Sequence, residues 1–422
     1  MKTTPVSIFA FLLFFLLCQN TFAQMDKTYL RHFPAATWTA PQIVLQTKDS
    51  TDFKPSIQIG TLLQAVGVLR EFPLTAAQNA NPNFNNRWGR QMNIYRARIL
   101  VGGNLTKKTS FFMETDIATP IGFTSTTGSK TMQVNPIILD AQIEHTFSKK
   151  IGVIAGLMLV GNTRNALQGA ASLMGLDFGY FQYPYNLFET SALQNNFGRD
   201  VGVNVRGFLA NERLEYRVGM FAGRNIDALG TLRYIGRLNY NFFDKEQDLY
   251  YTGTTLGKGK IFAVGGGVDF QDRYQNLAVD AFLDIPLGSA GSLTANTAFT
   301  YINGGDNPNQ QALSVRIPTQ TIQFLELGYY FKKAKLQPYL KYEAQNIDAT
   351  LLQSRGLNTE VFNTLNNNRR MGIGINYFFA GYNANVKLLY ENVSYGRTNL
   401  NGTNAETASR SEIWLQFQIF VF

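Results

Sequence analysis

Residues 93–117, NIYRARILVGGNLTKKTSFFMETDI, contain two runs in which charged and apolar side chains alternate. Arg96 and Arg98 alternate with apolar neighbours in the first run, and Glu114 and Asp116 do so in the second. Successive side chains of a β-strand point to opposite faces, so the pattern predicts a hairpin with one apolar and one charged face. A soluble β-sandwich and a membrane β-barrel would both show this alternation. The number of times that the pattern recurs along the chain distinguishes them.

The alternation recurs from residue 53 to the last residue of the sequence. Besides the hairpin, the candidate strands are Ser56–Leu69, Leu139–Phe147, Ile151–Val160, Arg199–Leu209, Leu214–Ala222, Tyr234–Phe242, Ile261–Phe270, Leu277–Leu283, Leu293–Tyr301, Ile322–Phe331, Leu336–Gln345, Met371–Phe379, Asn383–Glu391 and Ile413–Phe422. Long and short connections follow one another, except at 243–260, which is long, and at 271–276, which is short. About sixteen strands in this rhythm predict an all-β transmembrane antiparallel β-barrel with short periplasmic turns and long extracellular loops.

The composition agrees with a membrane barrel. Hydrophobic residues make up 45 % of the chain, with 20 Tyr and 33 Phe. Beyond the N-terminus no apolar stretch reaches the roughly 20 residues of a transmembrane helix. A barrel of about sixteen strands leaves an aqueous lumen, so we expect the polar faces to line water and the apolar faces to contact lipid. A bulge within 417–420 would place Phe422 on the lipid side, where such barrels carry an aromatic residue.

The N-terminal residues predict export. Lys2 precedes the apolar run Ile8–Leu17, and Thr21-Phe22-Ala23 forms a small-x-small cleavage site, so we expect residues 1–23 to be a cleaved signal peptide. A lipoprotein signal at Cys18 is disfavoured because the bulky Leu17 precedes it. Residues 24–52 are polar and lack a sustained period, which indicates a periplasmic N-terminal extension, and 53–422 form the barrel. The mature chain then has no cysteine, so its stability cannot come from disulfides.

The formal net charge is +9, but no basic run is longer than two residues. A nucleic-acid-binding protein needs a basic stripe and a recognisable module, so we expect no nucleic-acid partner.

The sequence offers little for catalysis or for metal binding. His32 and His145 are its two histidines, and His145 has lipid-facing parity near a predicted turn. Nucleophilic catalysis needs a base held by an orienting group, and zinc sites prefer His and Cys ligands. The sequence GKGK at 257–260 lacks the first glycine and the Ser/Thr of a phosphate loop. We therefore expect neither an enzyme nor a cofactor.

Several short motifs resemble the phosphate-selective porin O and P family across residues 53–422. They are Tyr95-Arg96-Ala97-Arg98, Asp140-Ala141, Gly198-Arg199-Asp200-Val201-Gly202, Arg206-Gly207, Leu214-Glu215-Tyr216-Arg217, Phe221-Ala222-Gly223, Gly236-Arg237-Leu238, Leu336-Gln337-Pro338-Tyr339 and Met371-Gly372-Ile373-Gly374. The resemblance implies a sixteen-stranded barrel of the Gram-negative outer membrane, often a homotrimer, that passes small solutes past one inward-folded loop. Residues 161–197, the longest connection, are the candidate for that loop.

The predicted lumen-facing charges have mixed signs. The candidate pore-lining residues are Arg96, Arg98, Glu114, Asp116, Asp140, Glu144, Arg206, Glu215, Arg217, Arg237, Asp280, Lys341, Glu343 and Lys387. They could form cross-strand charge pairs that stiffen the wall, which is the favoured interpretation, or a ladder that selects anions such as phosphate.

The sequence therefore predicts an outer-membrane porin for passive diffusion of small hydrophilic solutes or ions. The alternative is a structural or partner-binding outer-membrane barrel, part of a secretion or attachment complex, without specific flux.

Overall fold

The computed structural model describes residues 42–44, 53–71, 88–117, 121–124, 129–131, 135–182, 198–223, 231–303, 319–347, 366–397 and 405–422. In these residues nineteen strands form one sheet. Three are short: β1 (Gln42–Val44), β5 (Ile121–Thr124) and β6 (Ser129–Thr131). The other sixteen are β2 (Ser56–Glu71), β3 (Trp88–Asn104), β4 (Thr109–Ile117), β7 (Pro136–Ser148), β8 (Ile151–Leu159), β9 (Arg199–Leu209), β10 (Leu214–Phe221), β11 (Arg233–Asn241), β12 (Ile261–Gln271), β13 (Tyr274–Pro286), β14 (Gly291–Asn303), β15 (Gln320–Phe331), β16 (Leu336–Ile347), β17 (Asn366–Tyr377), β18 (Ala384–Arg397) and β19 (Ala405–Val421).

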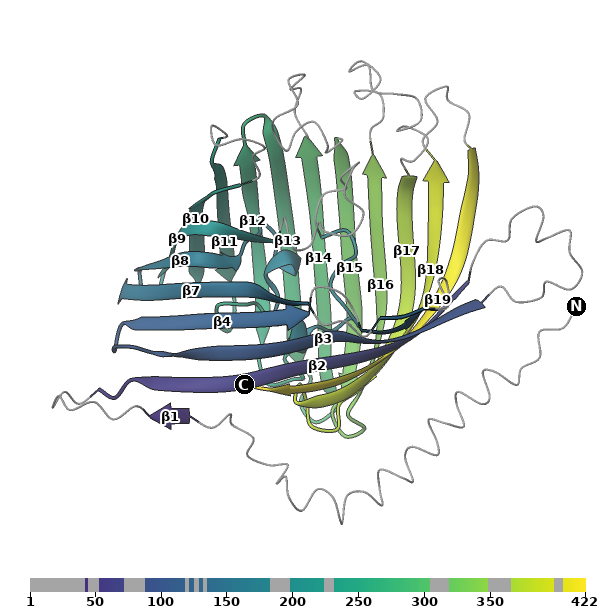
Figure 1. The fold of residues 1–422 in the computed structure, drawn as a ribbon, viewed down its shortest axis with the longest axis horizontal. Coiled ribbons are helices and arrows are strands. Elements are labelled where there is room, and N and C mark those ends of the chain that lie inside the picture. The colour runs from purple at the N-terminus through teal and green to yellow at the C-terminus, as the bar shows by residue number, and fades with distance from the viewer. Residues whose placement is uncertain are drawn as a thin grey trace, which may run out of the picture.

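The sixteen long strands close into an antiparallel barrel, which confirms the predicted fold class. Each pairs with its neighbours in chain order, and β19 pairs with β2, for example Leu415 with Gly67. Strands on opposite walls cross at a large angle in Figure 1, as expected when strands tilt against the barrel axis. No strand edge is left open between β19 and β2.

Short and long connections gather at opposite ends of the barrel. The short-turn end carries tight turns such as 105–108 and 332–335, and the other end carries the longer connections. The two predicted breaks in this rhythm are confirmed. Residues 242–260 form a long connection at the short-turn end, while Asp272 and Arg273 alone link β12 to β13 at the opposite end.

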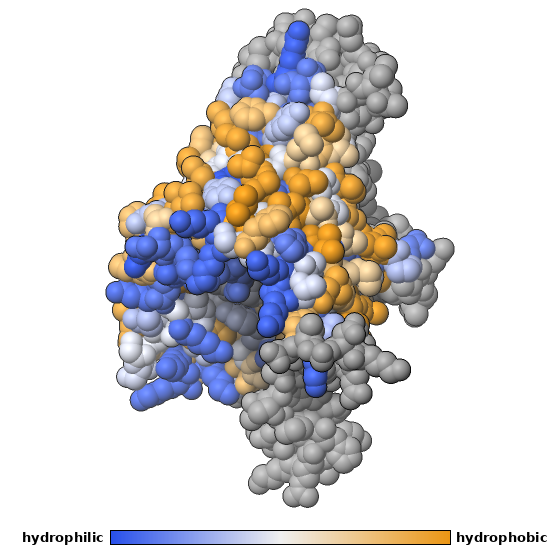
Figure 2. All heavy atoms as spheres, turned by 90° about the vertical axis from the view of Figure 1, so that its left-hand side faces the viewer, coloured by the Kyte–Doolittle hydropathy of each residue, from blue (hydrophilic) through white to orange (hydrophobic). Residues whose placement is uncertain are grey.

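Alternate side chains divide cleanly between the two faces of the wall. On β10, Val218 is 58 % exposed on the outer surface, whereas Arg217 is 6 % exposed inside. On β11, Leu238 is 56 % exposed and its neighbour Arg237 is 3 % exposed. Figure 2 shows hydrophobic residues over much of the outer surface, and hydrophilic residues around a hollow. The barrel thus has an apolar outside and a polar inside.

The expected bulge in the last strand is wrong. The pairing of β19 with β18 and β2 continues through residues 417–420 without a register shift. Phe422 therefore keeps the parity of Gln416 and Gln418 and packs inside the barrel in a cluster with Leu62 and Leu100. The apolar inner surface there compensates for placing an aromatic ring inside.

The N-terminal part of the chain is described only in part. Residues 1–41 and 45–52, which include the predicted signal peptide, lie outside the described residues. Within the predicted extension, β1 pairs antiparallel with the start of β2. Among the described residues no helix has the length and apolar character needed to cross a membrane.

Candidate functional site

The candidate pore-lining residues gather on the inner face of the wall. All of them are buried except Glu144, which is half-buried near the short-turn end of β7. They come from β3, β4, β7, β9, β10, β11, β13, β16 and β18. Their side chains meet because one alternate set of every strand faces the same enclosed space. Their role in lining a conducting path stays a prediction.

Most of these charges form short ion pairs. Arg98 on β3 contacts both Glu114 and Asp116 on β4, each at 2.7 Å. Arg237 on β11 donates to the two carboxylate oxygens of Asp280 on β13 at 2.5 and 2.8 Å. Bidentate guanidinium–carboxylate contacts of this kind hold two side chains in one geometry.

The same pattern continues around the wall. Glu215 accepts from Arg206 at 2.6 Å and from Arg217 at 2.8 Å, and Lys341 lies 2.9 Å from Glu343 on its own strand. The favoured interpretation of paired wall charges describes this arrangement, because each named cation has an acidic partner beside it.

A loop from the long-connection end crosses the interior. We call residues 161–182 the inner loop; it contains the 3-10 turns η2 (Asn165–Leu167) and η3 (Ala170–Ser172). It is rich in Gly and Ala, which lets its backbone lie close to the wall. At Gly267 on β12 an added Cβ would lie 2.7 Å from the carbonyl oxygen of Asn162. Residues 183–197 of the predicted inward loop lie outside the described residues.

Two lysines of the wall hold backbone carbonyls of the inner loop. Lys387 donates to Leu173 O at 2.6 Å and Gly175 O at 2.8 Å. Lys341 donates to Phe178 O at 3.0 Å. Lys387, a predicted pore-lining cation, thus holds the inner loop through two of its backbone carbonyls.

Arg96 departs from the pairing expected on the hairpin. Its Nη2 lies 2.7 Å from Asp177 of the inner loop, and its Nη1 donates to Gln64 at 2.7 Å. The Tyr95 hydroxyl also donates to Asp177, at 2.8 Å. Burial alone would raise the pKa of the Asp177 carboxyl, but Arg96 and these hydrogen bonds hold the pKa below its usual value.

A second inner loop, residues 242–260, enters from the short-turn end and meets the first. The backbone N–H of Tyr251 donates to Leu167 O at 2.9 Å, and the N–H of Gly169 donates to Tyr251 O at 3.0 Å. The Tyr251 hydroxyl donates to Glu215 on the wall at 2.6 Å. Two connections from opposite ends therefore form one layer across the lumen.

Arg164 joins the two inner loops. The side chain is fully buried, and its guanidinium contacts both carboxylate oxygens of Glu246, at 2.7 and 2.5 Å. The guanidinium carbon lies 3.7 Å from the ring centroid of Phe282 and 4.7 Å from that of Tyr251. A buried cation is stabilised by such a partner and such rings.

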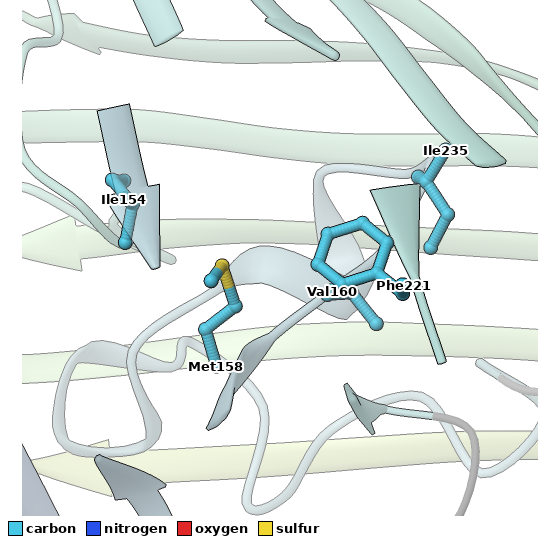
Figure 3. Packing of buried hydrophobic residues seen from close by; sticks show 5 residues of the cluster. All are labelled: Ile154, Met158, Val160, Phe221 and Ile235. Carbon is cyan, nitrogen blue, oxygen red and sulfur yellow. The ribbon is translucent and has the colours of Figure 1, made fainter. Parts of the chain in front are cut away.

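Part of the inner wall is apolar where the second inner loop packs. Ile154, Met158, Val160, Phe221 and Ile235 form the cluster in Figure 3, and Leu249 packs against it. The inner face is therefore apolar in part, although most of its side chains are polar. The loops need a dry surface to pack against, and these side chains supply it.

The remaining space inside the barrel is uneven. Among the described residues, the cavities beside β14–β16 and beside β8–β11 have volumes of about 10 Å³ each. A cavity of about 360 Å³ lies between the loops and the wall, where its lining comes mainly from β2, β3, β4, β7 and β19. The largest of these spaces thus lies beside the hairpin of β3 and β4.

His145 has no catalytic surroundings in the described residues. Its Nδ1 shares a 2.9 Å hydrogen bond with the Thr109 hydroxyl, and its ring packs edge-on against Phe147. No cluster of three His, Cys, Asp or Glu side chains that could hold a metal occurs in the described ranges.

Comparisons with known proteins identify the fold. No family model matches the sequence, and no curated protein matches it. The structure is similar to the outer membrane channel DcaP of Acinetobacter baumannii, with a TM-score of 0.51, 12% identity, and coverage of 86% of this chain and 97% of that one. It is also similar to Salmonella typhi OmpF, with a TM-score of 0.50, 12% identity, and coverage of 86% and 98%. The chain forms a porin-like barrel.

Sequence reasoning missed several residues that organise the interior of this porin-like barrel. Arg164 and Asp177 are the charged side chains of residues 161–182, and that isolation in a neutral stretch was the available signal. Glu246 and Tyr251 lie in the long connection that breaks the rhythm, and the length of a connection does not indicate whether it folds inward. No sequence pattern linked these residues to one another.

Proposed function

We propose that this chain is an outer-membrane porin that passes small hydrophilic solutes or ions by passive diffusion. The observation that supports this proposal is a closed barrel with an apolar outer surface, a charged inner wall and an inner loop that narrows the lumen. A closed barrel satisfies every ladder hydrogen bond, which is what the hydrocarbon interior demands of strands. The inner loop sets the width of the path.

The proposed path discriminates weakly by charge. Ion selectivity follows the unbalanced field along a pore, and paired charges project little field. Arg98, Arg217 and Arg237 each lie within 2.8 Å of a carboxylate. Selectivity for phosphate, the property in the name of the resembled family, would need guanidinium groups that exchange their carboxylate partners for the anion.

Current through the purified protein in a planar bilayer under a salt gradient tests the function. We expect discrete steps and a reversal potential close to zero. A strongly anion-selective reversal potential would contradict weak discrimination by charge. If Arg98→Gln then reduced that selectivity, the path would be an anion path. A folded barrel without current steps would contradict the porin proposal.

A second function is favoured by one observation. The two inner loops meet across the lumen and leave cavities of about 10 Å³ on two sides. A barrel so filled would suit a structural or partner-binding role in a secretion or attachment complex. The bilayer measurement separates the two, since a structural barrel carries no current.

We further propose that the chain is exported with residues 1–23 removed, that 24–52 remain periplasmic, and that three copies assemble in the outer membrane. N-terminal sequencing of protein from the membrane should start at Gln24. Native mass spectrometry in detergent should show three chains, and a monomer under conditions that keep the fold would contradict the trimer.

A further inference from the structure

The cavity of about 360 Å³ beside the hairpin has two unlike halves. Its volume is in the range of sites that hold small molecules. One half is charged and comes from the wall. The other is apolar and aromatic, and comes from the wall and from both inner loops. A passage that only needed water would not require the second half.

The charged half contains both signs in contact. Arg98 lies 2.7 Å from Glu114 and from Asp116, and Arg199 lies 3.2 Å from Asp140 and 3.8 Å from Glu114. Arg96 also lines the cavity, and it pairs with Asp177 of the inner loop at 2.7 Å. The three guanidinium groups of the lining therefore each have a carboxylate beside them, and of these carboxylates Glu114 and Asp116 line the cavity. A guest with a net negative charge would find no surplus cation there, whereas a zwitterion would find partners for both of its charges.

The apolar half offers a surface for a ring. Phe112 lies edge-on to Phe422 with ring centroids 5.9 Å apart, and edge-on to Tyr250 at 6.0 Å. Leu62 and Leu100 are buried beside them and line the same cavity. Edge-to-face contacts of this kind are the arrangement that aromatic guests extend.

Two polar atoms of the lining have no hydrogen-bond partner among the described residues. They are the Tyr250 hydroxyl and Oε1 of Gln182, both buried and both on the cavity. Buried polar atoms are normally hydrogen-bonded, and an orphan at a cavity points to a partner held in the cavity. Tyr250 can donate to a guest and Gln182 can accept from one.

We propose that this cavity is a binding site for a small aromatic solute without net charge, of the amino-acid zwitterion type. The inference rests on the proposed porin function, since it places the site on the solute path. The ring lies on Phe112 and Phe422, and the charged end faces Arg98 and Glu114. The Tyr250 hydroxyl donates to the carboxylate end of the guest.

Calorimetry on the folded protein in detergent tests binding whether or not the barrel conducts. L-phenylalanine should give a saturable heat with one site per chain. L-alanine lacks the ring and should give none, and 3-phenylpropionate keeps the ring but carries a net negative charge and should bind at least tenfold more weakly. Saturable binding of L-alanine, or none of L-phenylalanine, would overturn the proposal.

Substitutions of residues that line the cavity test whether the solute binds there. Tyr250→Phe should raise the dissociation constant about fivefold, the loss of one hydrogen bond, and Phe112→Ala should raise it further. Tyr301→Phe, on the outer surface and 41 % exposed, is the matched control and should bind as the parent does. Unchanged binding in both cavity variants would overturn the location. Current steps without L-phenylalanine binding defeat this inference alone, and binding without current steps defeats the porin proposal alone.

Discussion

Asp177 anchors the inner loop to two strands of the wall. Its carboxylate contacts Arg96 at 2.7 Å and Tyr95 at 2.8 Å, and Lys341 donates to its carbonyl oxygen at 3.2 Å. Both charged side chains are mostly out of water, so removing one leaves the other without compensation.

We predict that Asp177→Asn lowers the free energy of unfolding by about 3 kcal/mol, the cost of breaking a buried ion pair. The inner loop should also become looser, so single-channel conductance should rise and grow noisier. The double variant Arg96→Gln/Asp177→Asn is the control, because it leaves no unpaired charge and should recover most of the stability. Equal losses in the single and double variants would contradict a coupled pair.

The pKa of Asp177 sets the pH at which this contact fails. The folded-state pKa is held below the usual value of 3.8, so the stabilisation is complete above about pH 4 and is lost as pH falls through the folded-state value. We expect conductance to be constant between pH 8 and pH 5 and to rise below pH 4. In Asp177→Asn this acid-dependent rise should be absent. A transition near neutral pH would point to another group.

At this scale the sequence predicted the local pairs and not the distant ones. The alternation of the hairpin places Arg98 beside Glu114 and Asp116, and the structure has those contacts. The partner of Arg96 lies 81 residues away. No local period carries that information, because the loop that brings Asp177 inside has no regular pattern.

Among the elements, the second inner loop is the one that the strand rhythm marked but did not explain. A tight turn would connect β11 to β12 in the same place, yet residues 242–260 fold inward and meet the first inner loop. Arg164 fastens the two together through Glu246.

We predict that Arg164→Met separates the two loops. The variant leaves Glu246 without its bidentate partner inside the barrel, which should cost about 3 kcal/mol in the free energy of unfolding. Single-channel conductance should increase as the layer loosens. Lys245→Met is the matched control, since Lys245 lies at the surface with Glu212 at 3.5 Å and its loss should change neither quantity. An unchanged conductance in Arg164→Met would show that the layer does not limit the current.

The structure confirms the element order that the alternating pattern predicted, including both exceptions to the rhythm. Strand ends differ by up to eight residues, as at the start of β19, which is Ala405 rather than the predicted Ile413. The inward course of the loops was open, because loop conformation depends on contacts with several strands at once. The direction of Phe422 was mispredicted for a related reason: its neighbours inside the barrel are apolar, which parity alone does not reveal.

For the whole molecule, the pairing of β19 with β2 decides whether the barrel exists as a closed surface. Val68 on β2 pairs with Trp414 on β19 and with Gln91 on β3. Proline inside a central strand removes a ladder donor and is normally excluded there.

We predict that Val68→Pro prevents closure, whereas Val68→Ala, which keeps the N–H, closes normally. Closed barrels migrate faster in unheated detergent gels than after boiling, so the proline variant should lose this difference. A proline variant that still shows the difference would contradict the role of this seam.

The joining of first and last strands also governs how the protein assembles. Lys387 donates a hydrogen bond to a loop residue 214 positions away in sequence, and Gln64 donates one to Gln418, 354 positions away. Contacts so distant along the chain form late in folding, because the entropy cost of closing a long loop comes before the contacts stabilise the chain. The loops can thus fill the lumen only after the barrel has closed. A chain that stalls before closure exposes both its apolar outer face and two unpaired strand edges, which makes it a substrate for a chaperone that prevents aggregation.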